Sequence, residues 1–271
     1  RNIAAHYDLG NDLFALFLDD NMMYSSALFE ADDDSLETAS TRKLDRICRK
    51  LGLRPEHHVL EIGTGWGGFA IHAASVTGCR VTTATISEQQ YEYTARRVYE
   101  AGLTDRVTVL RKDYRDFTGR FDRVVSLEMV EAVGHEFYPH YFAKCGELLR
   151  PGGELLLQAI VMPEQRYQTY LKSVDFIQKY IFPGGCLPSI TAMQDAVTQH
   201  TSLRLLSIRD FAGGYAQTLQ EWRKRFHQNL SAVRELGCDE RFIRMWDYYF
   251  AYCEGAFEER AVGVVQAVWG R

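Results

Sequence analysis

The stretch 60-LEIGTGWGG-68 is the part of the sequence that decides the fold class, because four glycines follow a short apolar segment within six positions. A tight turn from a strand into a helix needs glycines where side chains would block the approach of a ligand. Gly63, Gly65 and Gly68 fit the G-x-G-x-x-G pattern of dinucleotide-binding turns. The stretch therefore predicts a strand, a nucleotide-binding turn and the start of a helix.

Short apolar segments alternate with helical stretches along most of the chain. Strands are predicted where apolar residues run together, at 58–62, 80–86, 107–110, 122–128, 153–160, 204–210 and 262–269. Alternation of strands with helices predicts a parallel sheet with crossover helices. The runs are apolar throughout, which is expected when helices cover both faces of the sheet. The predicted fold class is therefore α/β, a Rossmann-like, doubly wound and mostly parallel sheet.

The remaining segments suggest how the domain is organised. Helical spacing runs through 1–52, which we predict to be a helical N-terminal flank. After the fifth strand the alternation breaks, and 161–200 is rich in aromatic residues, so we predict an insertion there. Two helices follow, at 217–236 and 239–260. Since we find no repeat or linker, we expect one domain over 1–271. The first residue is Arg1 and not Met, so we expect that the chain comes from a longer polypeptide.

Two helices are predicted within the flank. The first covers 12-DLFALFLDD-20, in which the apolar residues share one face. The second begins at a capping box, 34-DSLE-37, with Asp34 as N-cap and Glu37 three residues on, and ends at Gly52. Its basic run, 42-RKLDRICRK-50, is expected to be a solvated helix face, with docking on a membrane surface as the alternative.

The composition argues against several classes of function. Of the 271 residues, 46% are hydrophobic and 25% charged, an ordinary balance for a globular protein. The net charge of −5 argues against a nucleic-acid binder, since attraction to phosphate needs a positive surface. Six cysteines are scattered without a C-x-x-C pair, which is typical of reduced thiols in a cytoplasmic protein and not of disulfides or a metal site.

The residues around the glycine turn indicate which nucleotide it binds. Glu61 precedes Gly63 by two residues, and Gly63, Gly65 and Gly67 complete the acid-x-Gly-x-Gly-x-Gly turn of enzymes that use S-adenosylmethionine (AdoMet). A dinucleotide-binding fold would instead place an acidic residue at the end of the second strand, where this chain has 83-TATIS-87. Both features favour AdoMet. A nicotinamide nucleotide and a purely structural turn are the alternatives.

Several further stretches, taken together in their order and spacing, resemble the cyclopropane-fatty-acyl-phospholipid synthases and their mycolic acid relatives. They are 6-HYDLGNDLF-14, 22-MMYSSALFE-30, 126-SLEMVEAVGHEFYPHYF-142, 180-YIFPGGCLPS-189, 215-YAQTLQEW-222 and 252-YCEGAFEER-260. The resemblance implies the class I AdoMet methyltransferase fold. It also implies transfer of a methylene group to the cis double bond of an unsaturated fatty acyl chain, which gives a cyclopropane fatty acid.

The resemblance implies a set of cofactor-binding residues. Tyr24 and Ser25 would touch AdoMet, and Gly63 and Gly65 would lie beneath its methionine and ribose. Tyr114 stands where relatives have a tryptophan beside the adenine, and Glu128 stands where some relatives have glycine. The full set implied for AdoMet is Tyr24, Ser25, Glu61, Gly63, Gly65, Gly67, Thr85, Gln90, Asp113, Tyr114 and Glu128.

The resemblance also implies a bicarbonate ion beside the transferred methyl group, where it would take the proton that an acyl carbocation loses on ring closure. The implied catalytic residues that hold it are Glu131, Tyr215, the backbone of Ile160, and Ser26 and Gln158, which replace a cysteine and a histidine common in relatives. Glu131 would anchor the ion and accept its hydroxyl proton. Gln158 can donate a hydrogen bond but cannot titrate, so it would only position the ion. Candidates for an aromatic wall around the cation are Tyr24, Phe137, Tyr138, Tyr141, Phe176 and Tyr180.

The expected partners are an unsaturated phospholipid or fatty acyl substrate and the inner surface of the cytoplasmic membrane, with 161–200 as a lid over the acyl chain and a homodimer left open. One alternative is a non-cyclising methyltransferase that makes methyl-branched, methylene-branched or furan-precursor fatty acids. Others are a small-molecule methyltransferase and a non-catalytic module that binds AdoMet or carries lipid. His6 and His135 are as well explained by structural hydrogen bonds as by catalysis.

Overall fold

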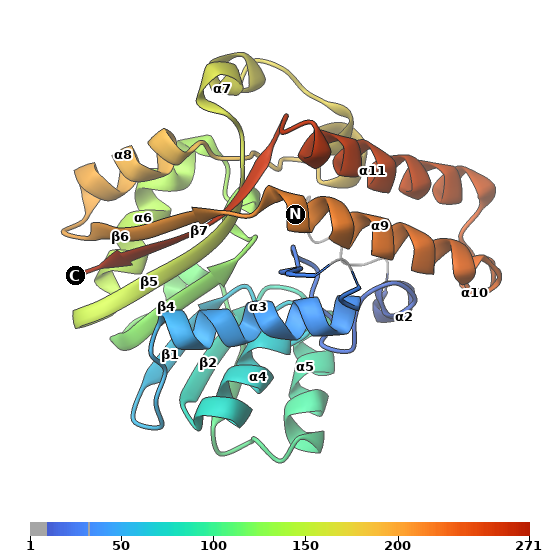
Figure 1. The fold of residues 1–271 in the computed structure, drawn as a ribbon. Coiled ribbons are helices and arrows are strands. Elements are labelled where there is room, and N and C mark those ends of the chain that lie inside the picture. The colour runs from blue at the N-terminus through green and yellow to red at the C-terminus, as the bar shows by residue number, and fades with distance from the viewer. Residues whose placement is uncertain (1–9, 32) are drawn as a thin grey trace.

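A computed structural model describes residues 10–31 and 33–271, and its centre is a seven-stranded sheet with the order β3-β2-β1-β4-β5-β7-β6 (Figure 1). The strands are β1 (His58–Ile62), β2 (Arg80–Thr85), β3 (Val107–Arg111), β4 (Phe121–Leu127), β5 (Leu149–Val161), β6 (Arg204–Asp210) and β7 (Gly263–Gly270). β1 to β5 pair in parallel, whereas β7 runs antiparallel to both β5 and β6. The predicted α/β class with a mostly parallel sheet is confirmed.

Helices cover both faces of the sheet because alternate strand residues point to opposite sides. Val59 and Leu156 pack with α3 (Leu36–Lys50), α4 (Gly68–Thr77) and α5 (Glu88–Glu100). Leu60 and Leu157 pack on the other face, with α6 (Tyr138–Glu147) and α8 (Ile190–His200). Since α8 belongs to this covering layer, the later part of the predicted 161–200 insertion packs on the sheet.

A second, aromatic-rich core lies beyond the sheet. It is built from the N-terminal segment with α2 (Asn11–Ala15) and the two long helices α9 (Ala212–Gln228) and α11 (Glu240–Glu258), which extend side by side away from the sheet (Figure 1). Phe17, Trp222, Trp246 and Phe250 form its centre, with rings meeting edge to face or tilted. The remaining helical segments are short: Tyr114–Asp116, Val130–Ala132, His135–Phe137, α7 (Glu164–Tyr170), the π-helix Ile177–Ile181 and α10 (Leu230–Glu235).

Two predictions about the flank are wrong in detail. The first helix ends at Ala15, because Asp19 accepts hydrogen bonds from the backbone of Asn21 and Met23 and turns the chain. The N-cap of α3 is Ser35 and not Asp34: the Ser35 hydroxyl accepts from the Thr38 amide at 3.1 Å. Asp34 instead forms an ion pair with Arg42.

The basic run of α3 is only in part a solvated face, since Arg49 and Lys50 are exposed and the other basic residues are not. Lys43 is 0% exposed, and Arg42 is engaged by Asp34. Arg46 donates to Gln266 on β7. Lys43 lies on the same stripe as Leu44 and Ile47, at helical spacing, and this stripe packs on the sheet.

All six cysteines are free thiols. Within 10–31 and 33–271, no helix is long and apolar enough to cross a bilayer. Over the same residues, no three His, Cys, Asp or Glu side chains gather in a way that could hold a metal ion. His6 and the start of the 6–14 stretch lie outside the described residues.

Candidate active site

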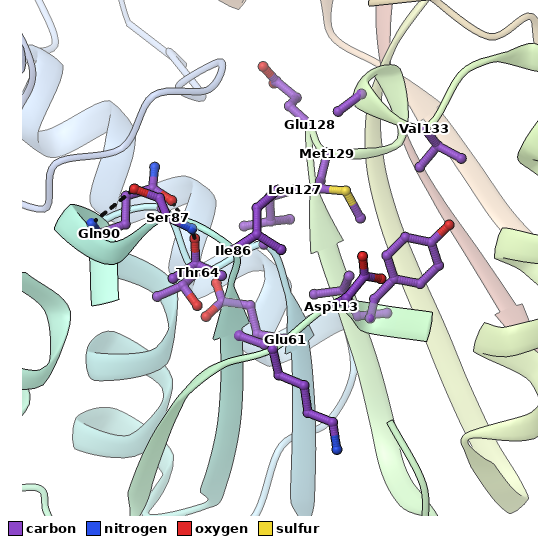
Figure 2. Close-up of a pocket in the computed structure, with 18 of the residues that line it drawn as sticks. Glu61, Thr64, Ile86, Ser87, Gln90, Asp113, Leu127, Glu128, Met129 and Val133 are labelled. Carbon is purple, nitrogen blue, oxygen red and sulfur yellow. Dashed lines mark hydrogen bonds between the residues drawn. The ribbon is translucent and has the colours of Figure 1, made fainter. Parts of the chain in front are cut away.

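A cavity of about 1000 Å³ opens at the carboxyl ends of β1, β2 and β4, the edge at which parallel α/β sheets bind ligands (Figure 2). Its size is that of a nucleotide-sized ligand site. Every residue of the predicted cofactor set except Gly67 lines it: Tyr24, Ser25, Glu61, Gly63, Gly65, Thr85, Gln90, Asp113, Tyr114 and Glu128. These residues come from segments up to 104 positions apart, and the sheet brings their ends to one edge.

The glycine turn leaves backbone open to this cavity. Gly65 has φ +53°, and a Cβ atom there would meet nothing within 4 Å. The space beside Gly65 is therefore room for a ligand. Gly67 has a different role: with φ +86° it caps the start of α4, and a Cβ atom would come within 2.6 Å of Thr94 on α5. The glycine at 67 serves helix packing and does not line the cavity.

Polar groups are preset around the turn. Thr83 donates to Glu61 Oε2 at 2.6 Å and in turn accepts from Thr64 at 2.7 Å, which leaves the other oxygen of Glu61 for a ligand. Burial raises the pKa of Glu61 to about 8, against the effect of the Thr83 hydrogen bond. On the next strand, Thr85 donates to the Gln90 carbonyl oxygen at 2.8 Å, so the Gln90 amide nitrogen remains free to donate.

Glu128 is the centre of a buried hydrogen-bond network at the end of β4. Its Oε1 accepts from the Ser26 amide at 2.9 Å and from Gln158 Nε2 at 2.7 Å, and its Oε2 accepts from the Tyr215 hydroxyl at 2.6 Å. The residue has φ +50°, a conformation that costs free energy for any residue with a Cβ atom. These three hydrogen bonds hold it there.

A polarised chain of side chains orients Gln158. Arg46 can only donate, and its Nε donates to Gln266 Oε1 at 3.2 Å. The Gln266 amide nitrogen must then face Gln158 Oε1, at 2.9 Å, and Gln158 Nε2 must face Glu128. Gln158 and Gln266 are direct cross-strand partners on β5 and β7. The chain therefore fixes Gln158 as a donor toward Glu128.

Lys43 supplies a buried positive charge behind this network. Its Nζ donates to the Ser25 hydroxyl at 2.7 Å. Burial lowers its pKa to about 8, while the charges of Glu128 and Asp19 raise it. Burial likewise raises the pKa of Glu128, and hydrogen bonds from Tyr215 and Gln158 together with the Lys43 charge oppose the shift. Lys43 and Glu128 thus form a compensated pair of buried charges.

Glu131 lies one turn further along and is bound differently. Its Oε1 accepts from the Ile160 amide at 2.6 Å, while its Oε2 is buried and has no hydrogen-bond partner among the described residues. Burial and the charge of Glu128 raise the pKa of Glu131 to about 8, so at neutral pH the carboxyl group mostly carries its proton. Its backbone carbonyl accepts from Cys186 at 2.7 Å, which joins the site to the insertion.

The structure thus gathers the predicted catalytic residues into two groups. Ser26, Gln158 and Tyr215 bind Glu128, and Ile160 binds Glu131. The five predicted catalytic residues do not line the cavity; they are Ser26, Glu131, Gln158, Ile160 and Tyr215. Glu128, which was predicted only as a cofactor ligand, does line it. The donors that the resemblance assigned to bicarbonate are already engaged: Gln158 Nε2 and the Tyr215 hydroxyl bind Glu128, the Ile160 amide binds Glu131, and the Ser26 hydroxyl donates to the Ala27 carbonyl at 3.1 Å. These residues as arranged do not fit the ion.

Of the predicted aromatic wall, only Tyr24 and Phe137 line the cavity. Tyr138 and Tyr141 belong to the core beneath the sheet, and Phe176 and Tyr180 belong to an outer surface described below. His135 bonds to the Tyr167 hydroxyl at 2.8 Å, a structural role. Sequence reasoning missed Lys43, Arg46 and Gln266. The stripe position of Lys43 was the only local signal for any of them.

Comparisons with known proteins agree with this geometry. The family model for mycolic acid cyclopropane synthetase matches residues 1–267. Tuberculostearic acid methyltransferase UfaA1 of Mycobacterium tuberculosis is 45% identical over 98% of this chain and 64% of its own length. Cyclopropane-fatty-acyl-phospholipid synthase of Escherichia coli is 42% identical over 98% of this chain and 66% of its own length. The chain therefore spans about two thirds of the length of these relatives.

Among solved structures, mycolic acid cyclopropane synthase CmaA1 complexed with SAH and CTAB superposes with a TM-score of 0.93 at 30% identity and covers 100% of this chain and 97% of that chain. The cyclopropane synthase MmaA2 of Mycobacterium tuberculosis gives the same TM-score at 29% identity, with the same coverage. The resemblance drawn from the sequence motifs is confirmed.

Proposed function

Because the chain belongs to the mycolic acid cyclopropane synthetase family, we propose that it is an AdoMet-dependent enzyme that adds a one-carbon unit to the cis double bond of an unsaturated fatty acyl chain. The observation that carries the proposal is the buried Glu128 network at the rim of a nucleotide-sized cavity. A small-molecule methyltransferase has no evident need for a carboxylate held in this way. A retired binding module has no need for it either.

The cavity fits AdoMet. Gly65 leaves open backbone, Glu61 offers a carboxyl oxygen to hydroxyl groups, and Gln90 offers an amide donor. Asp113 and Tyr114 would lie at the adenine end. When bound, AdoMet supplies an electrophilic methyl group. The complex of CmaA1 with SAH, the demethylated form of AdoMet, supports the same use of the cavity here.

The role of the protein follows from the reactivity of the acyl chain. An alkene that gains a methyl group becomes a carbocation, which water would quench, so the reacting carbons need a site that excludes water. The aromatic rings packed around Tyr24 provide such surroundings, since the ring centroids of Trp66, Phe182 and Trp222 lie 5.2–6.4 Å from that of Tyr24. Aromatic faces also attract a cation. Loss of a proton from the new methyl group then closes a cyclopropane ring, our proposed product.

A second candidate, non-cyclising methylation, is favoured by two specific observations. The 45% identical relative is named for tuberculostearic acid methylation and not for a cyclopropane. In addition, Glu128 stands where some relatives have glycine. If hydride migrates within the carbocation before the proton leaves, loss of a proton from the same methyl group gives a methylene branch. Both products therefore need the same base, and the timing of proton loss selects between them.

Lipid analysis tests the proposal and separates the two products. Lipids from a host that expresses the protein should contain acyl chains heavier than their unsaturated precursors by one CH2. A cyclopropane resists mild hydrogenation of alkenes, whereas a methylene branch takes up hydrogen. Absence of any heavier acyl chain, with purified protein and a range of unsaturated lipids as well, would refute the proposed activity.

We further propose that the insertion docks on a membrane to reach the acyl chain. Val174, Tyr180 and Tyr248 are 73%, 50% and 52% exposed, and Phe176 packs on Tyr248 with ring centroids 4.8 Å apart. Tyrosines on an apolar surface are typical of a membrane interface. Because much of the basic run of α3 is engaged within the protein, flotation with liposomes should depend little on salt. Val174→Glu should reduce it, whereas the control Val76→Glu, at a site 56% exposed on α4, should not.

A further inference from the structure

We propose that the Glu128 carboxylate takes the place of a bound anion and itself accepts the proton that leaves the new methyl group, so that this enzyme works without bicarbonate. The inference rests on the proposed function, and it holds for either product. It adds a catalytic residue that the motifs alone assigned to cofactor binding.

The first argument is that no donor is left for an ion. An anion at this place would need the Ser26 amide, Gln158 Nε2 and the Tyr215 hydroxyl, and all three point at Glu128 at 2.6–2.9 Å. The Ile160 amide is bound to Glu131 at 2.6 Å. A bicarbonate ion would have to displace a carboxylate that already has the same charge and the same hydrogen bonds. Replacing the Glu128 carboxylate by bicarbonate would therefore add neither charge nor hydrogen bonds at this position.

The second argument concerns which atom can take the proton. A carboxylate has about four acceptor positions on its two oxygens. Two donors occupy Oε1 and one occupies Oε2, so Oε2 keeps an acceptor position. Of the network residues and Glu131, Glu128 alone lines the cavity. Glu128 is therefore the residue of this network that is placed to meet a group held in the cavity.

The third argument is that a positive charge and several donors near Glu128 favour its ionised form. A base must be ionised before the reaction, and an isolated carboxylate in an apolar site would take up a proton from water instead. Lys43 provides the compensating charge from within the protein, through Ser25. Arg46 adds a second positive charge at the far end of the hydrogen-bonded chain that runs through Gln266 and Gln158. Burial raises the pKa of Glu128, and the hydrogen bonds of the network together with the Lys43 charge oppose that rise, so these surroundings favour the ionised form.

The step balances without any further reactant. A C–H bond of the new methyl group breaks, and its electron pair forms the third C–C bond of the ring or, after hydride migration, the C=C bond of a methylene branch. The proton forms an O–H bond at Glu128 Oε2. The carboxyl group returns this proton to solvent when the product leaves.

Two variants of one residue test the proposal. Glu128→Gly removes the carboxylate, leaves its donors unpaired, and relieves the positive φ, so the variant should fold. It should lose at least about 100-fold in turnover in bicarbonate-free buffer and regain at least about 10-fold when bicarbonate is added. The control Glu128→Gln fills the same space without a basic oxygen, so it should be equally slow and not regain activity. Turnover of the wild type should be the same with and without bicarbonate.

A binding measurement supplies a readout that does not depend on turnover. Broadening of the ¹³C NMR line of labelled bicarbonate should occur with Glu128→Gly and not with the wild type. The proposal is overturned if wild-type turnover falls when bicarbonate is removed, or if Glu128→Gly or Glu128→Gln reacts at the wild-type rate without it. Equal bicarbonate binding by the wild type and Glu128→Gly would overturn it too. If no variant modifies any lipid, the proposed function fails, while the binding measurement still reports whether Glu128 fills the anion position.

Discussion

Replacement of Glu131 by glutamine should change how the stability of the protein depends on pH. The folded structure raises the pKa of Glu131 to about 8, through burial and the charge of Glu128, whereas an unfolded glutamate titrates near 4.5. The folded protein therefore binds this proton more tightly than the unfolded chain. The resulting stabilisation is complete below pH 4.5 and is lost progressively as the pH rises to about 8.

The size of the change in the free energy of unfolding follows from the release of one proton between pH 4.5 and about pH 8. Each pH unit is worth about 1.4 kcal/mol for one proton, less where the folded group is itself partly ionised. Between pH 6 and pH 8 the wild type should therefore lose up to about 2 kcal/mol relative to Glu131→Gln, which cannot ionise. For a protein of this size, that difference corresponds to several degrees in Tm. Because Glu61 titrates in both proteins, its contribution cancels from the comparison.

Urea unfolding of the two proteins at several pH values measures the effect. The difference in the free energy of unfolding should widen from pH 6 to pH 8 and then level off. Glu136→Gln, at an exposed site, is the matched control and should follow the wild type throughout. A difference between wild type and Glu131→Gln that stays constant over this range would show that Glu131 is ionised in the folded protein, and the description of the site would be wrong.

Three further predictions concern the cavity and its supports. Gly65→Val should abolish AdoMet binding in a calorimetric titration. The control Gly52→Val places the same side chain at another open position with φ +53°, and it should lower only the stability of the protein. Tight binding of NAD in place of AdoMet would refute the cofactor assignment. Gln266→Leu should lower kcat by about tenfold at unchanged KM for AdoMet, because Gln158 is no longer held as a donor; an altered KM with normal kcat would contradict this role. Lys43→Met should raise the pKa of Glu128 and move the acid limb of the pH–rate profile to higher pH, while Lys50→Met on the same helix should leave the profile in place.

Local sequence patterns were sufficient for the strands of the sheet, whereas several helix limits differ: the helix predicted at 217–236 is α9 (Ala212–Gln228) followed by α10 (Leu230–Glu235). The segments predicted as strands at 58–62 and 204–210 coincide with β1 and β6. A strand can be predicted locally because its pattern of apolar residues lies within a few consecutive positions. The glycine turn with Glu61 likewise predicted where the nucleotide cavity opens, since residues that follow parallel strands meet at one edge of the sheet. In contrast, the residues 262–269 did not predict that β7 runs antiparallel to β5 and β6, because the apolar pattern of a strand is the same in either orientation relative to its neighbours.

The tertiary structure alone decided what the site residues do. The hydrogen bonds of Glu128 to Ser26 and Tyr215 span 102 and 87 residues, and the bond from Arg46 to Gln266 spans 220. Such contacts depend on how helices and strands pack and leave no mark on local spacing. By its own motifs the sequence determined the fold class and the position of the glycine turn at the cavity. Only folding showed that the Ser26 amide, Gln158 and Tyr215 bind the carboxylate of Glu128, because burial and donor direction are set where distant residues meet.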